Sequence, residues 1–141
     1  MKKSVLLVDD NSIDTMINEK IITSLGLFKE VHKASDGNRA LKIFNHYQNG
    51  TAQIPDIILL DLNMPVMDGF TFIQAFQSLN FPRKENVLIV IVTSSDNPSD
   101  VKLAKNMGIK YYLTKPLIYP DQEAHANLKN FTRVLCGYYE L

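Results

Sequence analysis

Residues 5–10 read Val-Leu-Leu-Val-Asp-Asp, an unbroken apolar run that ends in a pair of carboxylates. A continuous run of branched apolar residues is typical of a strand that is buried on both faces of a parallel sheet. Residues 57–60 and 87–92 have the same character, whereas residues 31–34 and 111–113 are less apolar or shorter. We therefore predict five strands.

Segments with helical periodicity lie between and after these strands. Apolar residues recur every three or four positions in residues 13–25, 40–47, 70–76, 101–107 and 124–135. Ser12 is the expected N-cap of the first helix, and Gly26 and Gly108 are expected helix ends. Pro120 is expected near the start of the last helix, because proline is preferred at the first helical position.

The alternation of strands and helices predicts the topology. Strands that are separated by helices cannot pair as hairpins, so they form a parallel sheet with right-handed crossovers. We predict a doubly wound α/β fold in which residues 1–141 form a single domain.

Composition excludes several classes of protein. The 141 residues include 15 Lys and Arg and 15 Asp and Glu, so no basic excess points to nucleic acid or to a membrane surface. Cys136 is the single cysteine and cannot form an internal disulfide. The first apolar run is too short for a signal peptide or a membrane span. We expect a cytoplasmic protein that binds neither nucleic acid nor membranes.

Polar residues follow the predicted strands where ligands bind in open α/β sheets, at the carboxyl ends. Asp9 and Asp10 follow the first strand, and Asp61 follows the third. Thr93 ends the fourth strand and Lys115 follows the fifth. Converging carboxylates repel one another unless a cation lies between them. Mg²⁺ prefers oxygen ligands and often binds carboxylates together with a phosphate, so we predict a Mg²⁺ site that works on a phosphoryl group.

The same residues could carry out phosphoryl transfer. The reaction depends mainly on neutralising the charge of the phosphoryl oxygens. Asp61 is the candidate nucleophile, Thr93 could donate to one phosphoryl oxygen, and Lys115 could pair with another. Each residue alone has an ordinary explanation, such as a turn, a helix cap or a solvated surface charge. The joint pattern carries the prediction.

At this point the motifs resemble the receiver domains of response regulators in two-component systems. The strongest local match is residues 61–69, Asp-Leu-Asn-Met-Pro-Val-Met-Asp-Gly, followed by residues 7–11. The resemblance covers residues 3–117 directly and the last helix by position. It implies a flavodoxin-like (βα)5 fold with strand order 2-1-3-4-5.

The resemblance also implies a metal site and a phospho-acceptor. Asp61 would accept the phosphoryl group. Asp9, Asp10 and Asp61 would bind Mg²⁺, together with the backbone carbonyl of Asn63. The phosphodonor would be a phosphohistidine on a sensor histidine kinase or on a phosphotransfer protein.

A switch is implied as well. Thr93 and Lys115 would contact the phosphoryl group, and Thr93 would move together with Tyr112 when the group arrives. Pro116 would follow a cis peptide bond. The protein would act as a stand-alone switch, as a monomer or weak homodimer, that signals by contact with a downstream protein or relays the phosphoryl group onward. It would be no enzyme beyond its own phosphorylation and dephosphorylation.

Two alternatives stay open at this stage. A haloacid-dehalogenase-like phosphatase also uses an aspartate nucleophile with Mg²⁺, but it needs a second aspartate two positions later, where this chain has Asn63. A pseudo-receiver would act as an interaction module without phosphate. The loops 48–55 and 80–86 look longer than in minimal receivers, which bears on the choice of partner.

Overall fold

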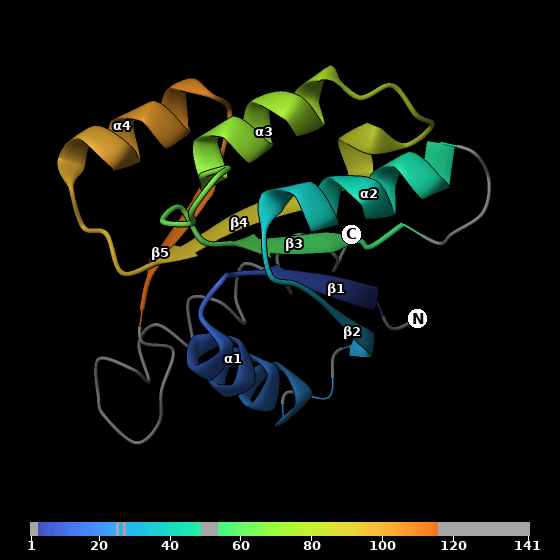
Figure 1. Ribbon diagram of the computed structural model, residues 1–141, viewed down its shortest axis with the longest axis horizontal. Coiled ribbons are helices and arrows are strands. Elements are labelled where there is room, and N and C mark those ends of the chain that lie inside the picture. The colour runs from blue at the N-terminus through green and yellow to red at the C-terminus, as the bar shows by residue number, and fades with distance from the viewer. Residues whose placement is uncertain (1–2, 25, 27, 49–53, 116–141) are drawn as a thin grey trace.

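The structure is a computed structural model that describes residues 3–24, 26, 28–48 and 54–115. Within these residues strands and helices alternate along the chain (Figure 1). The elements are β1 (Lys3–Val8), α1 (Ser12–Ser24), β2 (Phe28–Ala34), α2 (Gly37–Gln48), β3 (Ile57–Leu60), α3 (Gly69–Ser78), the 3-10 turn η1 (Lys84–Asn86), β4 (Leu88–Thr93), α4 (Pro98–Asn106) and β5 (Tyr111–Thr114). The predicted last helix near Pro120 lies outside the described residues.

The five strands form one parallel sheet in the order β2-β1-β3-β4-β5, which confirms the predicted topology. Val8 of β1 is level with Leu60 of β3. The next residues of both strands, Asp9 and Asp61, therefore leave the sheet side by side. The Asp61 N–H donates to the Val8 carbonyl at 2.9 Å and fixes this register.

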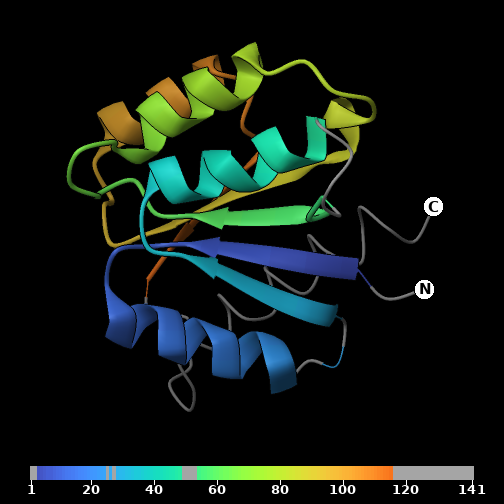
Figure 2. The same ribbon diagram turned by 45° about the vertical axis from the view of Figure 1, so that its right-hand side comes forward.

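Helices cover both faces of the sheet. Figures 1 and 2 show α2, α3 and α4 on one face and α1 on the other. Successive strand residues point to opposite faces. In β1, Leu6 and Val8 therefore pack with the core that contains Phe44, whereas Val5 and Leu7 pack with Ile22 of α1. Burial on both faces explains why β1, β3 and β4 are apolar without alternation.

Aromatic rings fill the core beneath α2 and α3. The Phe44 and Phe76 rings meet edge to face with centroids 5.0 Å apart, and Phe81 lies 5.9 Å from Phe44. Edge-to-face and offset contacts of this kind add to the stabilisation from burial. Phe81 is buried although it belongs to the segment 80–86, which the sequence predicted to be a loop. That segment is therefore anchored to the core and contains η1.

The observed helix ends contradict the predicted N-cap and agree with the two predicted glycine ends. Ser12 was predicted to cap α1, and this is wrong: the Asn11 side-chain oxygen accepts from the N–H groups of Ile13 and Asp14, both at 3.0 Å. Ser12 is already the first helical residue, so the residue before it is placed to cap. Gly26 (φ 65°) and Gly108 (φ 87°) lie just after α1 and α4 in the left-handed conformation that suits a helix end.

Apolar spacing identified α1 as a helix better than it identified the buried face. Ile13 is 63% exposed and Met16 is 51% exposed, whereas Asn18 and Ile22 are the buried residues of this helix. The periodic pattern shows only which side chains are apolar, whereas burial depends on which other parts of the fold cover them. None of the helices in the described residues has the length and apolarity needed to cross a membrane.

Candidate functional site

Three carboxylates meet at the carboxyl end of the sheet. Asp9, Asp10 and Asp61 each offer an oxygen, and these oxygens all lie within 4.8 Å of one another. Asp9 and Asp61 are both only 6% exposed, while Asp10 is exposed to solvent. A set of oxygen ligands with one open side suits a hard cation that keeps some of its water. The residues present therefore fit a divalent metal ion.

Lys115 is the cation that the described residues supply to this cluster. Its ammonium nitrogen lies 2.7 Å from Asp9 Oδ2, 2.9 Å from Asp14 Oδ2 and 3.2 Å from Asp61 Oδ2. An ammonium has three N–H donors, so all three are engaged. The Lys115 backbone N–H donates to the Thr93 carbonyl at 2.7 Å, which positions the lysine at the end of β5 beside β4. The lysine side chain is only 10% exposed.

At Asp9 and at Lys115, burial shifts the pKa in one direction and the oppositely charged neighbours shift it in the other. Burial raises the pKa of the Asp9 carboxyl, against the lowering effect of its hydrogen bond from Lys115. Burial alone would lower the pKa of Lys115, but its hydrogen bonds to Asp9 and Asp14 outweigh burial and raise it. Lys115 is therefore held in its charged form at neutral pH, and it is available to neutralise anionic groups.

The backbone around the acceptor candidate is tightly constrained. Asp9 Oδ1 accepts from the Asn11 N–H at 2.9 Å, and Asp61 Oδ1 accepts from the Asn63 N–H at 3.3 Å. Gly69 begins α3 directly against this loop. A Cβ at Gly69 would lie 2.6 Å from the Asp61 carbonyl oxygen and 2.8 Å from Leu62 Cα, closer than real Cβ contacts allow. Only glycine fits here without moving the backbone of Asp61.

A hydrogen-bonded chain links Thr93 to Tyr112. Thr93 is fully buried, and its hydroxyl oxygen accepts from the Ser95 N–H at 3.3 Å. The Tyr112 hydroxyl donates to the Ser95 carbonyl at 2.8 Å, and the Ser95 hydroxyl donates to Asp100 of α4 at 2.6 Å. Burial is the main cause of the raised pKa of Tyr112. The loop after β4 is thus tied to both β5 and α4.

Val66, in the loop between β3 and α3, is held in a conformation that a branched side chain disfavours. Its φ is 68°, and the residue is 96% exposed. The flanking residues form a tight turn in which the Met67 N–H donates to the Pro65 carbonyl at 2.7 Å. Because a left-handed β-branched residue costs on the order of 1–2 kcal/mol, Val66 is strained and gains little from burial.

Val66→Gly is expected to raise the free energy of unfolding by about 1 kcal/mol, because glycine adopts this conformation without strain. The measurement is denaturant-induced unfolding. Val66→Ala is the matched control, since it removes the exposed side chain but keeps a Cβ at positive φ. Equal stabilisation by both variants would show that the exposed side chain, and not the backbone, is the cause.

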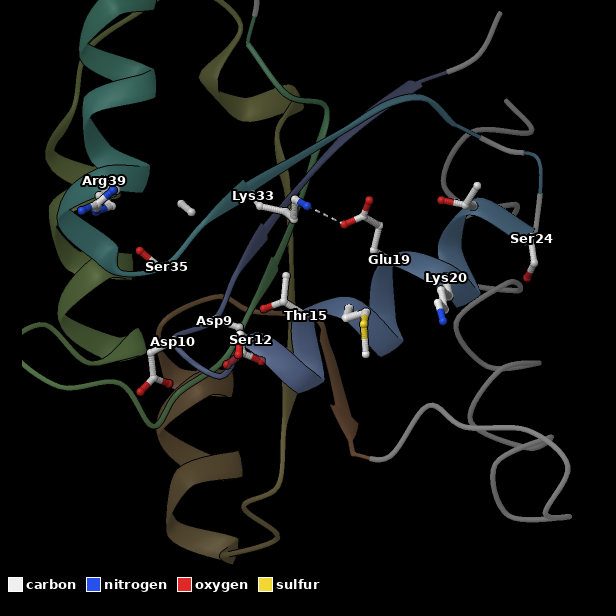
Figure 3. Close-up of a pocket in the computed structure, with 13 residues that line it drawn as sticks. Asp9, Asp10, Ser12, Thr15, Glu19, Lys20, Ser24, Lys33, Ser35 and Arg39 are labelled. Carbon is white, nitrogen blue, oxygen red and sulfur yellow. Dashed lines mark ion pairs between the residues drawn. The ribbon is translucent and has the colours of Figure 1, made fainter.

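A cavity of about 890 Å³ extends from the acidic cluster between α1 and β2. Figure 3 shows it along α1, with Asp9 and Asp10 at one end and Ser24 at the other. Acidic and basic side chains line it together, and Glu19 pairs with Lys33 across it at 2.9 Å. The cluster is thus open to solvent on the side of α1.

The structure places the predicted site residues as follows. The carboxylates and Lys115 converge, and Thr93 and Tyr112 lie on neighbouring strands linked through one loop residue. The predicted cis bond before Pro116 lies outside the described residues. Asp14 and Gly69 were missed. An acidic residue in a first helical turn is usually explained by the helix dipole, so Asp14 gave no distinct signal. Gly69 ends the motif at residues 61–69, but a glycine after aspartate is usually explained by a turn, so its close approach to Asp61 was not predicted.

Comparisons with known proteins agree with this geometry. The sequence pattern of the response regulator receiver domain matches residues 5–127. The probable chemotaxis protein CheY of Rhizobium etli is 31% identical over 123 residues, which is 87% of this chain and 88% of that protein. A two-component response regulator from Cytophaga hutchinsonii superposes with a TM-score of 0.74 at 31% identity, over 93% of this chain and 97% of that one.

A further similar structure is that of a complex with BeF3 and Mg²⁺. The CheX–CheY–BeF3–Mg²⁺ complex of Borrelia burgdorferi contains a chain that superposes with a TM-score of 0.73 at 28% identity, over 96% of this chain and 89% of that one. The fold, the strand order and the sequence match all lead to one family. The chain belongs to the response regulator receiver domains, the signalling switches of two-component systems.

Proposed function

We propose that this chain accepts a phosphoryl group on Asp61, from a phosphohistidine of a sensor histidine kinase or phosphotransfer protein, with Mg²⁺ bound beside it. The observation that carries the proposal is the contact of Lys115 with both Asp9 and Asp61 inside a cluster of carboxylates. Carboxylates this close together repel one another unless cations lie between them. Phosphoryl transfer requires cations at the same place, to neutralise the phosphoryl oxygens. The Borrelia burgdorferi complex, with BeF3 and Mg²⁺, supports the same chemistry by analogy.

The residues suggest a division of roles. A carboxylate oxygen of Asp61 would attack phosphorus, so that an O–P bond forms while the P–N bond to the donor imidazole breaks and its electron pair leaves with the nitrogen. Asp9, Asp10 and Asp61, with the Asn63 carbonyl, would hold Mg²⁺, which supplies charge neutralisation at the phosphoryl oxygens. Lys115 would exchange its contact with the Asp61 carboxylate for one with a phosphoryl oxygen.

Signalling would follow from the loop after β4. A phosphorylated aspartate presents more negative charge and new acceptor oxygens, which favour a state in which the Thr93 hydroxyl donates to them. Thr93 contacts Ser95, and Ser95 contacts Tyr112 and Asp100. Inward movement of Thr93 would therefore alter the surface formed by α4 and β5, where a downstream protein could bind.

The test is intact mass after incubation with acetyl phosphate. A gain of one phosphoryl group is expected with Mg²⁺, no gain with excess chelator, and no gain in Asp61→Asn, whose amide is a far weaker nucleophile. Asp96→Asn is the matched control, because Asp96 is an exposed aspartate in the loop after β4. A gain that persists in Asp61→Asn, or that ignores the chelator, would refute the proposal.

The other expectations remain predictions. A phosphatase acting on small phosphoesters gains no support here, since Asn63 stands where that chemistry needs an acid. A receiver that no longer takes phosphate would gain no mass in any sample, and a Mg²⁺ titration would then separate it from a receiver that strictly needs a protein donor, because the former would not bind Mg²⁺. The single-domain extent of residues 1–141, the cytoplasmic location, the lack of nucleic-acid or membrane binding and the monomeric or weakly dimeric state stay predictions of the sequence.

A further inference from the structure

Asp14 is an additional acidic residue at the phosphoryl site. It lies in the first turn of α1, one turn beyond the aspartate pair that follows β1. Its carboxylate is 2.9 Å from the Lys115 ammonium and is 36% exposed, whereas the ammonium is only 10% exposed. Because the lysine also contacts Asp9 and Asp61, Asp14 takes the third of its three donors.

This position places a negative charge close to the acceptor. The Lys115 ammonium lies between the two carboxylates, 2.9 Å from Asp14 Oδ2 and 3.2 Å from Asp61 Oδ2. Asp14 Oδ2 is therefore no more than about 6 Å from an oxygen of the carboxylate that would take the phosphoryl group, a range at which unit charges interact measurably even when water screens them.

Counting formal charges shows the consequence. Asp9, Asp10, Asp14 and Asp61 bring four negative charges, and Lys115 brings one positive charge. A bound divalent cation leaves the site with a net negative charge when Asp14 is included. Without Asp14 the charges of the loaded site would cancel.

We propose that Asp14 is a positioning residue that sets the charge balance of the phosphoryl site, so that it strengthens binding of the divalent cation and disfavours anionic phosphodonors. The inference rests on the proposed function and deepens it. A site that carries this extra charge discriminates against small phosphodonor anions in solution. It leaves phosphorylation to a partner protein whose binding contributes other favourable contacts.

The test is Asp14→Asn, which removes the charge but keeps an oxygen that can accept from Lys115. Mg²⁺ affinity, measured by calorimetric titration, is expected to fall roughly threefold to tenfold. The rate of phosphorylation by acetyl phosphate at saturating Mg²⁺, measured by intact mass, is expected to rise by roughly the same factor. Both changes should shrink as ionic strength increases, because salt screens the charge.

Two variants serve as controls. Asp14→Glu keeps the charge and should return both quantities close to those of the wild-type chain. Glu19→Gln removes a carboxylate of the same helix that is also 36% exposed but pairs with Lys33, and it should change neither quantity.

The outcomes separate this inference from the proposed function. If the wild-type chain takes a phosphoryl group but Asp14→Asn matches it in both measurements, the inference is overturned and the proposed function stands. A fall in both Mg²⁺ affinity and phosphorylation rate would show a merely structural role and would also overturn it. If the wild-type chain takes no phosphoryl group with Mg²⁺ present but Asp14→Asn does, the inference and the proposed function both stand, and if neither takes one while Asp14→Asn binds Mg²⁺ no more weakly than the wild-type chain, both fall.

Discussion

Replacing Lys115 by methionine is expected to slow phosphorylation of Asp61 by about 100-fold to 1,000-fold, the usual effect of removing one charge-stabilising donor from a phosphoryl or acyl transfer site. The lysine contacts the acceptor carboxylate directly and is nearly buried. Methionine has a similar length and keeps most of the packing, so the loss should come from the missing charge. The measurement is the phosphorylation rate with acetyl phosphate at saturating Mg²⁺.

The same variant should also lose stability when no Mg²⁺ is present. Removal of Lys115 leaves the carboxylates of Asp9 and Asp61 close together, each about as buried as the lysine itself. Leaving buried charges without their partner typically lowers the free energy of unfolding by about 3–5 kcal/mol. We expect a loss at the lower end, about 3 kcal/mol, because Asp14 is partly exposed. Mg²⁺ should restore much of this loss, because it supplies the missing positive charge.

The control for this prediction is Lys33→Met. Lys33 also pairs with a carboxylate at 2.9 Å, but it is 54% exposed. Exposed ion pairs contribute about 0–1 kcal/mol, so this variant should unfold near the wild-type denaturant concentration with or without Mg²⁺. Equal stability losses for the two variants, or a Lys115→Met loss that Mg²⁺ does not reduce, would contradict the role assigned to Lys115.

Gly69→Ala is expected to lower the free energy of unfolding by about 2–4 kcal/mol, because the added Cβ overlaps backbone atoms that cannot rotate away. The overlap is with the carbonyl oxygen of Asp61 and with Leu62 Cα. Relief requires a shift of the acceptor loop or of the start of α3. A displacement of about 1 Å in a reacting group can cost 100-fold in rate, so phosphorylation should slow as well, by at least about tenfold.

Gly26→Ala is the matched control for this variant. Gly26 also has a conformation that favours glycine, with φ 65°, but a Cβ there would meet nothing within 4 Å. Only backbone strain of about 1 kcal/mol is expected, with no change in phosphorylation rate. Unfolding by denaturant and the acetyl phosphate rate should be measured for both. If the two variants cost the same stability and leave the rate unchanged, close contact at Gly69 is not the constraint.

The convergence of the site residues could be predicted because it depends on a simple geometric rule. Asp9 and Asp61 each follow an apolar strand, and the carboxyl ends of parallel strands share one edge of the sheet. Thr93 and Lys115 follow the same rule on the next two strands. The order of the strands came from the family resemblance, since apolar periodicity does not say which strand lies beside which.

Other features depended on contacts that no local pattern reports. Asn11 and Ser12 are both good capping residues, and only the path of the chain after Asp10 makes Asn11 the cap. The segment 80–86 is mostly polar, yet Phe81 reaches the ring of Phe44 in α2. In the second case a residue distant in sequence decides the outcome.

Sequence patterns alone were enough to predict the alternation of strands and helices and the presence of acidic, hydroxyl and ammonium groups at one edge of the sheet. Strands buried on both faces must be apolar throughout, and this requirement is local enough to be seen in the three runs that form β1, β3 and β4. Two contacts could not be predicted without the packed fold: Asp14 shares Lys115 with Asp9 and Asp61, and Gly69 packs directly against the Asp61 carbonyl. Those contacts depend on the rotation of α1 and the start of α3 against the sheet, which packing of the whole core sets.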